Sequence, residues 1–490
     1  MSPAEPAQAR HLEYAVAARG RAGLAQLVEH PPCKRKVFGS IPKAGTKGLA
    51  AVGATLLGLA AQAAQAAQAD ESGQRVVVTG SVAERLAAEA PFAITLIDAE
   101  LLRQAGPRVH LSEALARVPG LVANNRHNFA QDLQLSSRGF GARAGFGVRG
   151  LRLYTDGIPA TMPDGQGQPA HFDLAGAERL EVLRGPFSVL YGNSSGGVVA
   201  LFTAPVREAQ AEAAWDAGSF GLRQLRVGLA TPLGGGLDLR ASATALQIDG
   251  FRPHSAARRG LAHLRLGWND ADDRVTFIAG AFEQPADDPL GLSREQFEAD
   301  PRQTTPQATQ FDTRKSARQQ QAGLSWQRRL DAGALREGRV ALYAGTRSVA
   351  QWLAIAPGTQ ANPRHGGGVI DFDRRYHGLD ARLRWAWDGL DLLAGAAIEQ
   401  QSDQRRGFEN FSGTPLVLGS TGVLRRDETN TATTRDLFVQ AEWALADGWS
   451  ATAGLRAGRV TLAAVDRFLA NGDDSGRLAF DYRNPVLGLH

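Results

Sequence analysis

The sequence predicts a mainly β protein, in which a compact α+β domain precedes a membrane-spanning antiparallel β-barrel. Two observations support this fold class. From residue 212 onward, segments of about ten residues alternate apolar and polar side chains, as the strands of membrane barrels do. Residues 81–206 instead combine helical periodicity with a few short strand patterns.

The alternation is most regular in three segments of the C-terminal half. In residues 449–458, Trp449, Leu455 and three alanines occupy every second position, and Ser, Thr, Gly and Arg occupy the others. Residues 379–385 and 437–445 show the same pattern. Because successive side chains of a strand point to opposite faces, each segment has one apolar and one polar face. A soluble β-sandwich also alternates, but its strands are shorter.

The connections between these segments favour a membrane barrel over a sandwich. Short turns rich in Gly and Asp alternate with long polar loops. The short turns are at 234–236, 269–273, 331–337, 388–389 and 447–448, and the long loops are near 250–259, 284–318, 353–375 and 403–434. Membrane barrels have short turns at one end and long loops at the other, so we expect about twelve strands between residues 212 and 488.

The preceding segment, residues 81–206, has the pattern of a mixed domain. Asp98 is placed to cap a helix that Gly106-Pro107 ends, and a second helix with apolar residues at helical spacing runs from Leu111 to Val118. Short strands are expected at 149–154, 179–183 and 196–203. This domain is too small to contain an enzyme with its own cofactor domain.

The N-terminal residues have the composition of an export signal. Lys43 and Lys47 precede an apolar stretch and an Ala-rich run that ends at Ala69, which predicts a signal peptide over 43–69 with cleavage after Ala69. A signal seldom begins so far into a chain, so residues 1–42 are interpreted as a spurious extension from a misplaced start codon. Removal of both segments would also remove Cys33, the only cysteine.

Composition excludes several classes of protein. Of the 54 Lys and Arg residues eight lie in residues 1–69, and of the 50 Asp and Glu residues three do, so residues 70–490 carry 46 basic and 47 acidic side chains. A nucleic-acid-binding body is not expected from this balance. A single cysteine excludes a disulfide framework and a multi-thiolate metal site.

Several motifs resemble those of TonB-dependent outer-membrane receptors. They are Gln74–Gly80, Val148–Pro159, Glu178–Pro186, Leu190–Gly192 and Gly196–Val199, in the order of that family. The resemblance implies a TonB box at 74–80, a plug domain at 81–206 and a barrel at 207–490. It also implies a Gram-negative outer membrane location, contact with outer-membrane lipid, coupling to the TonB–ExbB–ExbD complex, and active import of a scarce extracellular ligand. By resemblance that ligand is a ferric siderophore or a ferric citrate-type chelate, and neither enzymatic activity nor a cofactor is expected.

The coupling residues implied by the resemblance are Val76, Val77, Val78, Thr79 and Gly80. A short β-branched run beside a processed N-terminus can add to the sheet edge of a partner through main-chain hydrogen bonds. An ordinary first strand is the alternative interpretation.

Two further sets of residues are candidates for function. Charges of the plug are expected to form salt bridges with the barrel wall, the alternative being a solvated face: Arg138, Arg149, Glu178, Arg179, Glu181 and Arg184. Polar residues of Gly- and Pro-rich loops are expected to bind the ligand, the alternative being solvated loops: His127, Gln131, Arg143, Asp164, Gln166, Gln168 and His171. The histidines could instead contact a metal directly, although their spacing is not a ligand signature.

The strand count and a second motif leave alternatives open. The family resembled here has barrels of about 22 strands, so about twelve indicate a truncated or frameshifted chain, which could be a non-functional remnant. A passive porin, or a receptor for copper, cobalamin or an oligosaccharide, also fits the barrel. Residues 192–196 match the G-x-S-x-G motif of serine hydrolases, but a strand pattern follows where that motif needs a helix.

Overall fold

The computed structural model describes residues 76–77, 82, 85–86, 92–184, 188–192 and 194–489. The predicted extension and signal peptide lie outside the described residues, as do Val78, Thr79 and Gly80 of the predicted coupling segment. Val76–Val77 form strand β1, which pairs antiparallel with β2 (Arg85–Leu86).

The plug is built around a five-stranded sheet. Its order is β3 (Ala93–Asp98), β8 (Ala177–Arg184), β9 (Gly197–Thr203), β6 (Leu151–Thr155) and β7 (Ile158–Pro159). Around it lie α2 (Ala99–Ala105), α3 (Leu111–Leu115), β4 (Leu121–Asn124), β5 (Gln134–Ser137), η2 (Pro169–His171) and α4 (Ser188–Tyr191). The expected strands are confirmed, each to within about two residues, as is usual for element ends.

Both predicted helices of the plug form. The side chain of Asp98 accepts a hydrogen bond from the Leu101 amide at 2.8 Å, which caps α2. The second helix is shorter than predicted, because α3 ends at Leu115 and the chain turns before Val118. The helices and the sheet share a fully apolar core that includes Leu115, Leu153 and Leu180.

The rest of the chain forms one antiparallel sheet of 12 strands in sequence order, which confirms the predicted number. The strands are β10 (Gln210–Ala217), β11 (Arg223–Gly234), β12 (Leu237–Ile248), β13 (Ala257–Asn269), β14 (Asp273–Asp287), β15 (Arg314–Ala332), β16 (Leu335–Trp352), β17 (Val369–Trp387), β18 (Leu390–Phe408), β21 (Leu424–Ala446), β22 (Trp449–Asp466) and β23 (Gly476–Leu489). We call this sheet the wall. β10 and β23 are the two edges of the wall as described.

The two faces of the wall differ in the sense expected for a membrane barrel. On β21, Leu437 and Trp443 are 69% and 56% exposed, whereas Asp436 and Glu442, which point to the opposite face, are 6% and 5% exposed. Apolar side chains therefore face outward and polar side chains face inward, the reverse of a soluble sheet that packs on an apolar core. Among the described residues, no helix is long and apolar enough to cross a membrane.

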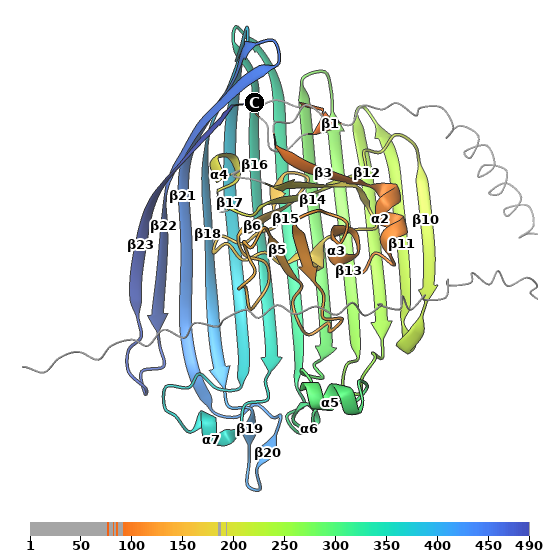
Figure 1. Cartoon of the computed structure of the whole chain (residues 1–490), viewed down its shortest axis with the longest axis vertical. Coiled ribbons are helices and arrows are strands. Elements are labelled where there is room, and N and C mark those ends of the chain that lie inside the picture. Colours follow the sequence, from red (N-terminus) through yellow and green to blue (C-terminus); the bar gives the residue numbers. More distant parts are fainter. Residues whose placement is uncertain are drawn as a thin grey trace, which may run out of the picture. The chain divides into compact units, whose positions relative to one another are not determined.

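The two ends of the wall also differ (Figure 1). Tight turns such as Asp388-Gly389 and Asp447-Gly448 lie at one end, here called the turn end. The other end, the loop end, carries α5 (Arg294–Ala299), α6 (Pro306–Gln310), α7 (Pro357–Gln360), β19 (Phe411–Ser412) and β20 (Val417–Leu418). The predicted loop over 403–434 was too long, because β18 continues to Phe408 and β21 begins at Leu424. The polar residues at these ends of β18 and β21 still form backbone pairs between the two strands, so polar composition alone does not show where a strand ends.

The plug packs against the inward face of the wall. At one contact, Val189, Leu190 and Tyr191 of α4 form an apolar cluster with Leu393 and Phe438 of the wall. A second cluster joins Ile158 and Met162 of the plug to Tyr343 and Tyr376 of the wall. These clusters hold the plug against the wall, and thereby position the polar groups described next.

Candidate functional site

A polar cavity of about 410 Å³ lies between the plug and the loop-end half of the wall. Plug loops and strands β15 to β18 provide most of its lining. Its charged lining comprises six cations and three carboxylates: Arg143, Arg149, Lys315, Arg347, Arg374 and Arg405, with Asp132, Asp164 and Asp403. We call it the loop-end cavity. Its excess of positive charge favours an anionic occupant.

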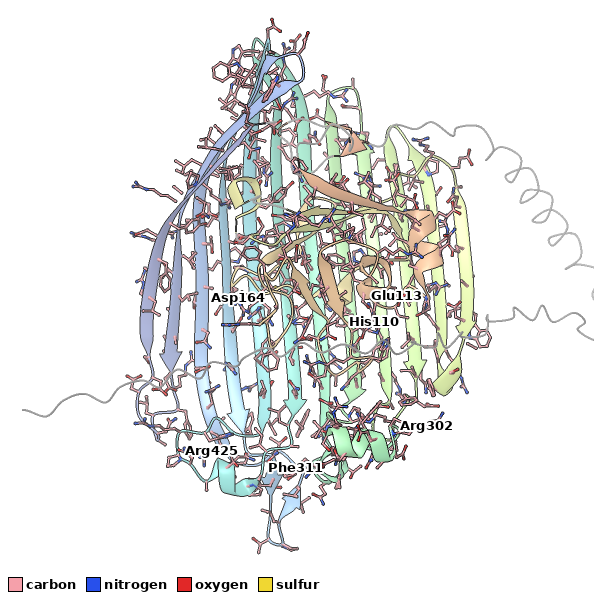
Figure 2. The ribbon with its side chains drawn as sticks, in the orientation of Figure 1. His110, Glu113, Asp164, Arg302, Phe311 and Arg425 are labelled. Atoms are coloured by element: carbon pink, nitrogen blue, oxygen red, sulfur yellow. The ribbon has the colours of Figure 1, made fainter. Side chains whose placement is uncertain are left out.

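Asp164 is a plug residue that lines this cavity (Figure 2). Its carboxylate accepts a hydrogen bond from the Gln166 amide at 2.9 Å, which shapes the turn that carries it. Its amide donates to the Gln401 side chain of the wall at 3.1 Å, and Arg149 donates to its carbonyl at 3.1 Å. The carboxylate of Asp164 is therefore presented to the wall by a braced loop.

Arg374 of β17 is the wall cation that Asp164 meets. Its guanidinium donates to Asp403 at 2.7 and 2.6 Å and to Asp164 at 3.1 Å. Because an arginine fork can serve two carboxylates at once, Arg374 joins a wall carboxylate to a plug carboxylate. An anionic ligand that enters the cavity must compete with Asp164 for this cation.

A second plug carboxylate, Asp132, has a similar partner. The Lys315 ammonium of β15 lies 2.8 Å from its carboxylate. Burial alone would raise the pKa of Asp132, but Lys315 and Arg347 hold that pKa below its usual range, so the carboxylate is ionised at neutral pH. Two carboxylates of the plug are thus paired with cations of the wall.

Arg347 of β16 differs from these cations. It is 5% exposed, and its guanidinium donates to the neutral Gln319 side chain at 2.8 Å. Among the salt bridges of the described residues, none includes Arg347. A buried cation without a salt-bridged carboxylate is costly, so an anionic ligand in the cavity would also stabilise Arg347.

The predicted ligand residues separate into two groups. Arg143, Asp164, Gln166 and Gln168 all line the loop-end cavity, so the structure brings four of the seven together. The other three lie elsewhere: His127 is exposed, Gln131 donates to Asp288 at 2.6 Å, and His171 lines a separate small cavity. Within the described part of the chain, no group of three or more His, Cys, Asp or Glu is placed to hold a metal ion.

None of the salt bridges found among the described residues joins one of the six predicted plug charges to the wall. Arg149 pairs with Asp164 of the plug, and Arg179 pairs with Glu178 and Glu181 of its own strand. Arg184 donates to the Pro119 carbonyl and the Thr95 hydroxyl, also in the plug, and exposed Arg138 takes part in none of the salt bridges found among the described residues. Charges that are close in the plug pair with one another, whereas pairing with the wall depends on which wall side chains lie opposite them.

Among the plug–wall salt bridges of the described residues, the most buried is made by Arg152. Its guanidinium donates to both carboxylate oxygens of Glu399 on β18, at 3.2 and 2.8 Å. The Tyr343 hydroxyl of β16 donates to the same carboxylate at 2.7 Å. All three side chains are buried, and we call this group the latch.

Sequence reasoning missed Arg152, although a signal for it exists. The signal is a single charge in an otherwise uncharged short strand, LRLYT, and in the structure all five residues of β6 are buried, so Arg152 requires a buried partner. Its partner Glu399 lies 247 residues away. Lys315, Arg347 and Arg374 were missed because the faces to which they point depend on the register of each strand.

Two enclosed plug histidines give the structure a pH dependence. Burial lowers the pKa of both His110 and His171 to about 3, and electrostatic repulsion acts in the same direction, from Arg259 on His110 and from His263 and Arg347 on His171. An imidazole whose pKa falls on folding binds fewer protons in the folded state. Its contribution to the free energy of unfolding is therefore complete above the ordinary pKa of 6.5 and is lost as the pH falls toward 3.

We expect the melting temperature of the chain to be several degrees lower at pH 5 than at pH 7.5. The double variant His110→Gln/His171→Gln should lose much of this difference. Thermal melts of both proteins in the same detergent at both pH values test this prediction, and an equal pH effect in both would contradict it.

Comparison with known proteins gives two family matches. Residues 87–199 match the model of the TonB-dependent receptor plug domain, and residues 257–489 match the model of the TonB-dependent receptor-like β-barrel. A hemin receptor of Yersinia enterocolitica is 30% identical over 130 residues, which are 26% of this chain and 18% of that protein.

Solved structures share the fold. The unliganded ferric citrate transporter FecA aligns with a TM-score of 0.65 at 19% identity, over 82% of this chain and 60% of FecA. The ferric yersiniabactin uptake receptor FyuA from Yersinia pestis aligns with a TM-score of 0.63 at 18% identity, over 81% of this chain and 62% of FyuA. The aligned part is therefore less than two thirds of each of these relatives. With a plug packed on the inward face of an antiparallel wall, and with both family models matched in order, the chain belongs to the family of TonB-dependent receptors.

Proposed function

We propose that the protein is an outer-membrane receptor that binds an anionic metal chelate, of the ferric siderophore or ferric citrate type, in the loop-end cavity and imports it with energy from the TonB–ExbB–ExbD complex. The observation that carries this proposal is the charge of that cavity, with six cations and three carboxylates between plug and wall. Two of the carboxylates belong to the plug and are bound to wall cations. A ligand can replace them.

The names of the relatives agree with a chelate as ligand. FecA is named for ferric citrate and FyuA for ferric yersiniabactin, and the titles of other solved relatives name ferric preacinetobactin and copper. Carboxylate-rich chelates are matched chemically by guanidinium groups, which bind carboxylates through paired hydrogen bonds. Among these ligands, an anionic chelate fits the lining of the cavity best.

Two alternative functions fit the geometry less well. In a passive porin the lumen is open, whereas here the plug is bound to the wall by the latch and by two apolar clusters. In a serine hydrolase the nucleophile must be exposed on a turn that leads into a helix. Ser194 is 0% exposed, its hydroxyl donates to the Gly192 carbonyl at 3.3 Å, and strand β9 follows.

Coupling to TonB is proposed to use the segment that contains β1. Its partner strand β2 is only two residues long, so β1 can exchange that pairing for the sheet edge of a partner. Farther along the chain, the Val82 amide donates to Glu442 of the wall at 3.0 Å, and the Val82 side chain packs in the cluster with Tyr191. A pull on the coupling segment would thus be transmitted to the plug through Val82.

Replacing Val77 with Pro tests the proposed function. Proline removes a main-chain N–H and opposes strand pairing, so we expect energised uptake to fall at least about tenfold while chelate binding is retained. Uptake of radiolabelled ferric citrate and related chelates would be measured in a TonB-containing Gram-negative host. Val77→Ile, which preserves strand propensity, should transport like the unmodified chain. Equal uptake by Val77→Pro would contradict coupling through this segment.

A further inference from the structure

A second polar cavity, of about 380 Å³, lies at the turn end of the wall. Residues 269–274 and the turn-end parts of β15 to β18 provide most of its lining, and Val82 and Tyr191 of the plug border it. We call it the turn-end cavity. Its charged lining comprises five arginines and four carboxylates: Arg274, Arg329, Arg339, Arg382 and Arg384, with Asp270, Asp272, Asp273 and Glu337.

Three of these arginines have no carboxylate partner. Arg382 and Arg384 form salt bridges with aspartates of the wall, at 2.6 and 2.7 Å. The salt bridges found among the described residues include none of the other three, Arg274, Arg329 and Arg339. These three guanidiniums are therefore open to an anion that enters the cavity.

The carboxylates of the cavity are partly committed elsewhere. The Asp270 carboxylate accepts hydrogen bonds from the Asp272 and Asp273 amides, at 2.9 and 2.7 Å, and so holds its own turn. The Asp273 carboxylate lies 3.4 Å from Arg328, which does not line the cavity. Only Asp272 and Glu337 remain to balance the three unpaired arginines, and the excess of positive charge favours an anion.

The strand register brings two of the unpaired arginines together. Arg274 of β14 lies opposite Gln327 of β15, and Gln327 lies opposite Arg339 of β16. Residues in one such row point to the same face, and neighbouring strands are about 4.8 Å apart. Arg274 and Arg339 thus lie on either side of Gln327, roughly 10 Å apart at the backbone. Side chains of this length can converge on an anion that has more than one carboxylate.

Arg339 is the unpaired arginine that reaches the plug. Its guanidinium donates to the Gly157 carbonyl at 3.2 Å. Gly157 has a φ of +76°, and a Cβ at this position would overlap the guanidinium, so glycine permits the close approach. The carbonyl is neutral, whereas a carboxylate would form a charge-assisted hydrogen bond. A carboxylate in the cavity can therefore replace the plug at Arg339.

The plug turn that holds Arg339 also separates the two cavities. Ile158, next to Gly157, packs in an apolar cluster with Tyr343 of β16. Tyr343 lies between Arg339 of the turn-end cavity and Arg347 of the loop-end cavity, on the same strand. These two arginines are roughly 26 Å apart along the strand. The apolar cluster is thus a barrier between two cationic cavities on one face of the wall.

We propose that Arg274 and Arg339 form a second binding site, for carboxylate groups, and that this site receives the imported chelate after it passes the plug. The existence of the site follows from the contacts at the turn end, and only its role in transport rests on the proposed function. Residues 157 and 158 both occupy Arg339 and close the barrier. Displacement of this turn would therefore open the path and free the receiving arginine in one movement.

Binding of citrate, a tricarboxylate, to the full chain in detergent micelles tests the site. Because citrate can also enter the loop-end cavity, Arg374→Gln is present in every sample. Within this background we expect Arg274→Gln/Arg339→Gln to weaken citrate binding at least about tenfold, as for the loss of charged hydrogen bonds. Arg274→Lys/Arg339→Lys should retain most of the binding.

The matched control is Arg336→Gln, also in the Arg374→Gln background. Arg336 lies on β16 three residues from Arg339 and pairs with Asp331 at 3.5 Å, so its loss should leave citrate affinity unchanged. Far-UV circular dichroism confirms that each variant is folded. Equal citrate affinity with and without Arg274→Gln/Arg339→Gln, or no citrate binding in the Arg374→Gln chain, would overturn the site.

Uptake of an anionic ferric chelate tests the receiving role. Arg339→Gln should lower the maximal rate at least about threefold and leave KM unchanged, because the residue acts after the ligand has bound at the loop end. An equal maximal rate would overturn this role. Citrate binding at the turn end by a chain that imports no chelate would refute the proposed function and the receiving role, but would support the site.

Discussion

Replacing Arg152 with Met is expected to lower the free energy of unfolding by about 3–5 kcal/mol, because it leaves the Glu399 carboxylate buried without its cation. The Tyr343 hydroxyl, at 2.7 Å, remains as a partner but carries no charge. Urea unfolding of the chain in detergent, with the susceptibility of the plug to protease as a second measure, would report the loss. This is the largest effect on stability that we expect from a single substitution.

The reason for this size is the asymmetry of buried ion pairs. Breaking the pair leaves one buried charge without a partner, whereas removing both charges leaves no buried charge at all. The double variant Arg152→Met/Glu399→Leu should therefore recover most of the stability lost by Arg152→Met. Arg459→Gln, which breaks a pair whose side chains are 61% and 68% exposed, should have no measurable effect. Equal stability of Arg152→Met and the unmodified chain would show that the latch does not hold the plug.

Replacing Asp164 with Asn is expected to strengthen the binding of an anionic chelate by about three- to tenfold, which corresponds to about 0.7–1.4 kcal/mol. The substitution removes the carboxylate that occupies Arg374 and repels an incoming anion. If Asp164 instead contacted the metal or a donor group of the ligand, the same change would weaken binding. The sign of the effect therefore distinguishes the two roles.

The matched control for this experiment is Asp331→Asn, which makes the same chemical change at the exposed turn-end tip of β15. It should leave chelate affinity unchanged. Isothermal titration of each purified chain with ferric citrate and other anionic ferric chelates gives the affinities. Weaker binding by Asp164→Asn would contradict the idea that the plug carboxylate competes with the ligand.

The fold class could be predicted from the sequence because it depends on local periodicity. Alternation over residues 449–458 reappears as strand β22, and Asp98 caps α2 as its position before an apolar helix predicted. The loop lengths were less accurate, since the polar ends of β18 and β21 continue the hydrogen-bonded ladder beyond the apolar segment. Periodicity reports which face is buried, but not where pairing stops.

The site was predictable only in part, for a different reason. Asp164 and Arg143 lie in Gly- and Pro-rich loops, and such loops can be recognised from composition. Arg347 and Arg374 lie within long strands, where the same residue types occur on both faces. Which of them reach the cavity depends on strand register and on the position of the plug, and neither is a local property of the sequence.

The most direct test of the central claim is the affinity of anionic ferric chelates for the unmodified chain and for Arg374→Gln. The claim is that the loop-end cavity binds its ligand through wall cations that the plug carboxylates otherwise occupy. We expect at least one chelate to bind the unmodified chain and to bind Arg374→Gln about 10- to 100-fold more weakly, as for the loss of a charged hydrogen bond. Unchanged affinity in Arg374→Gln, or no binding of any anionic chelate to the unmodified chain, would contradict the claim.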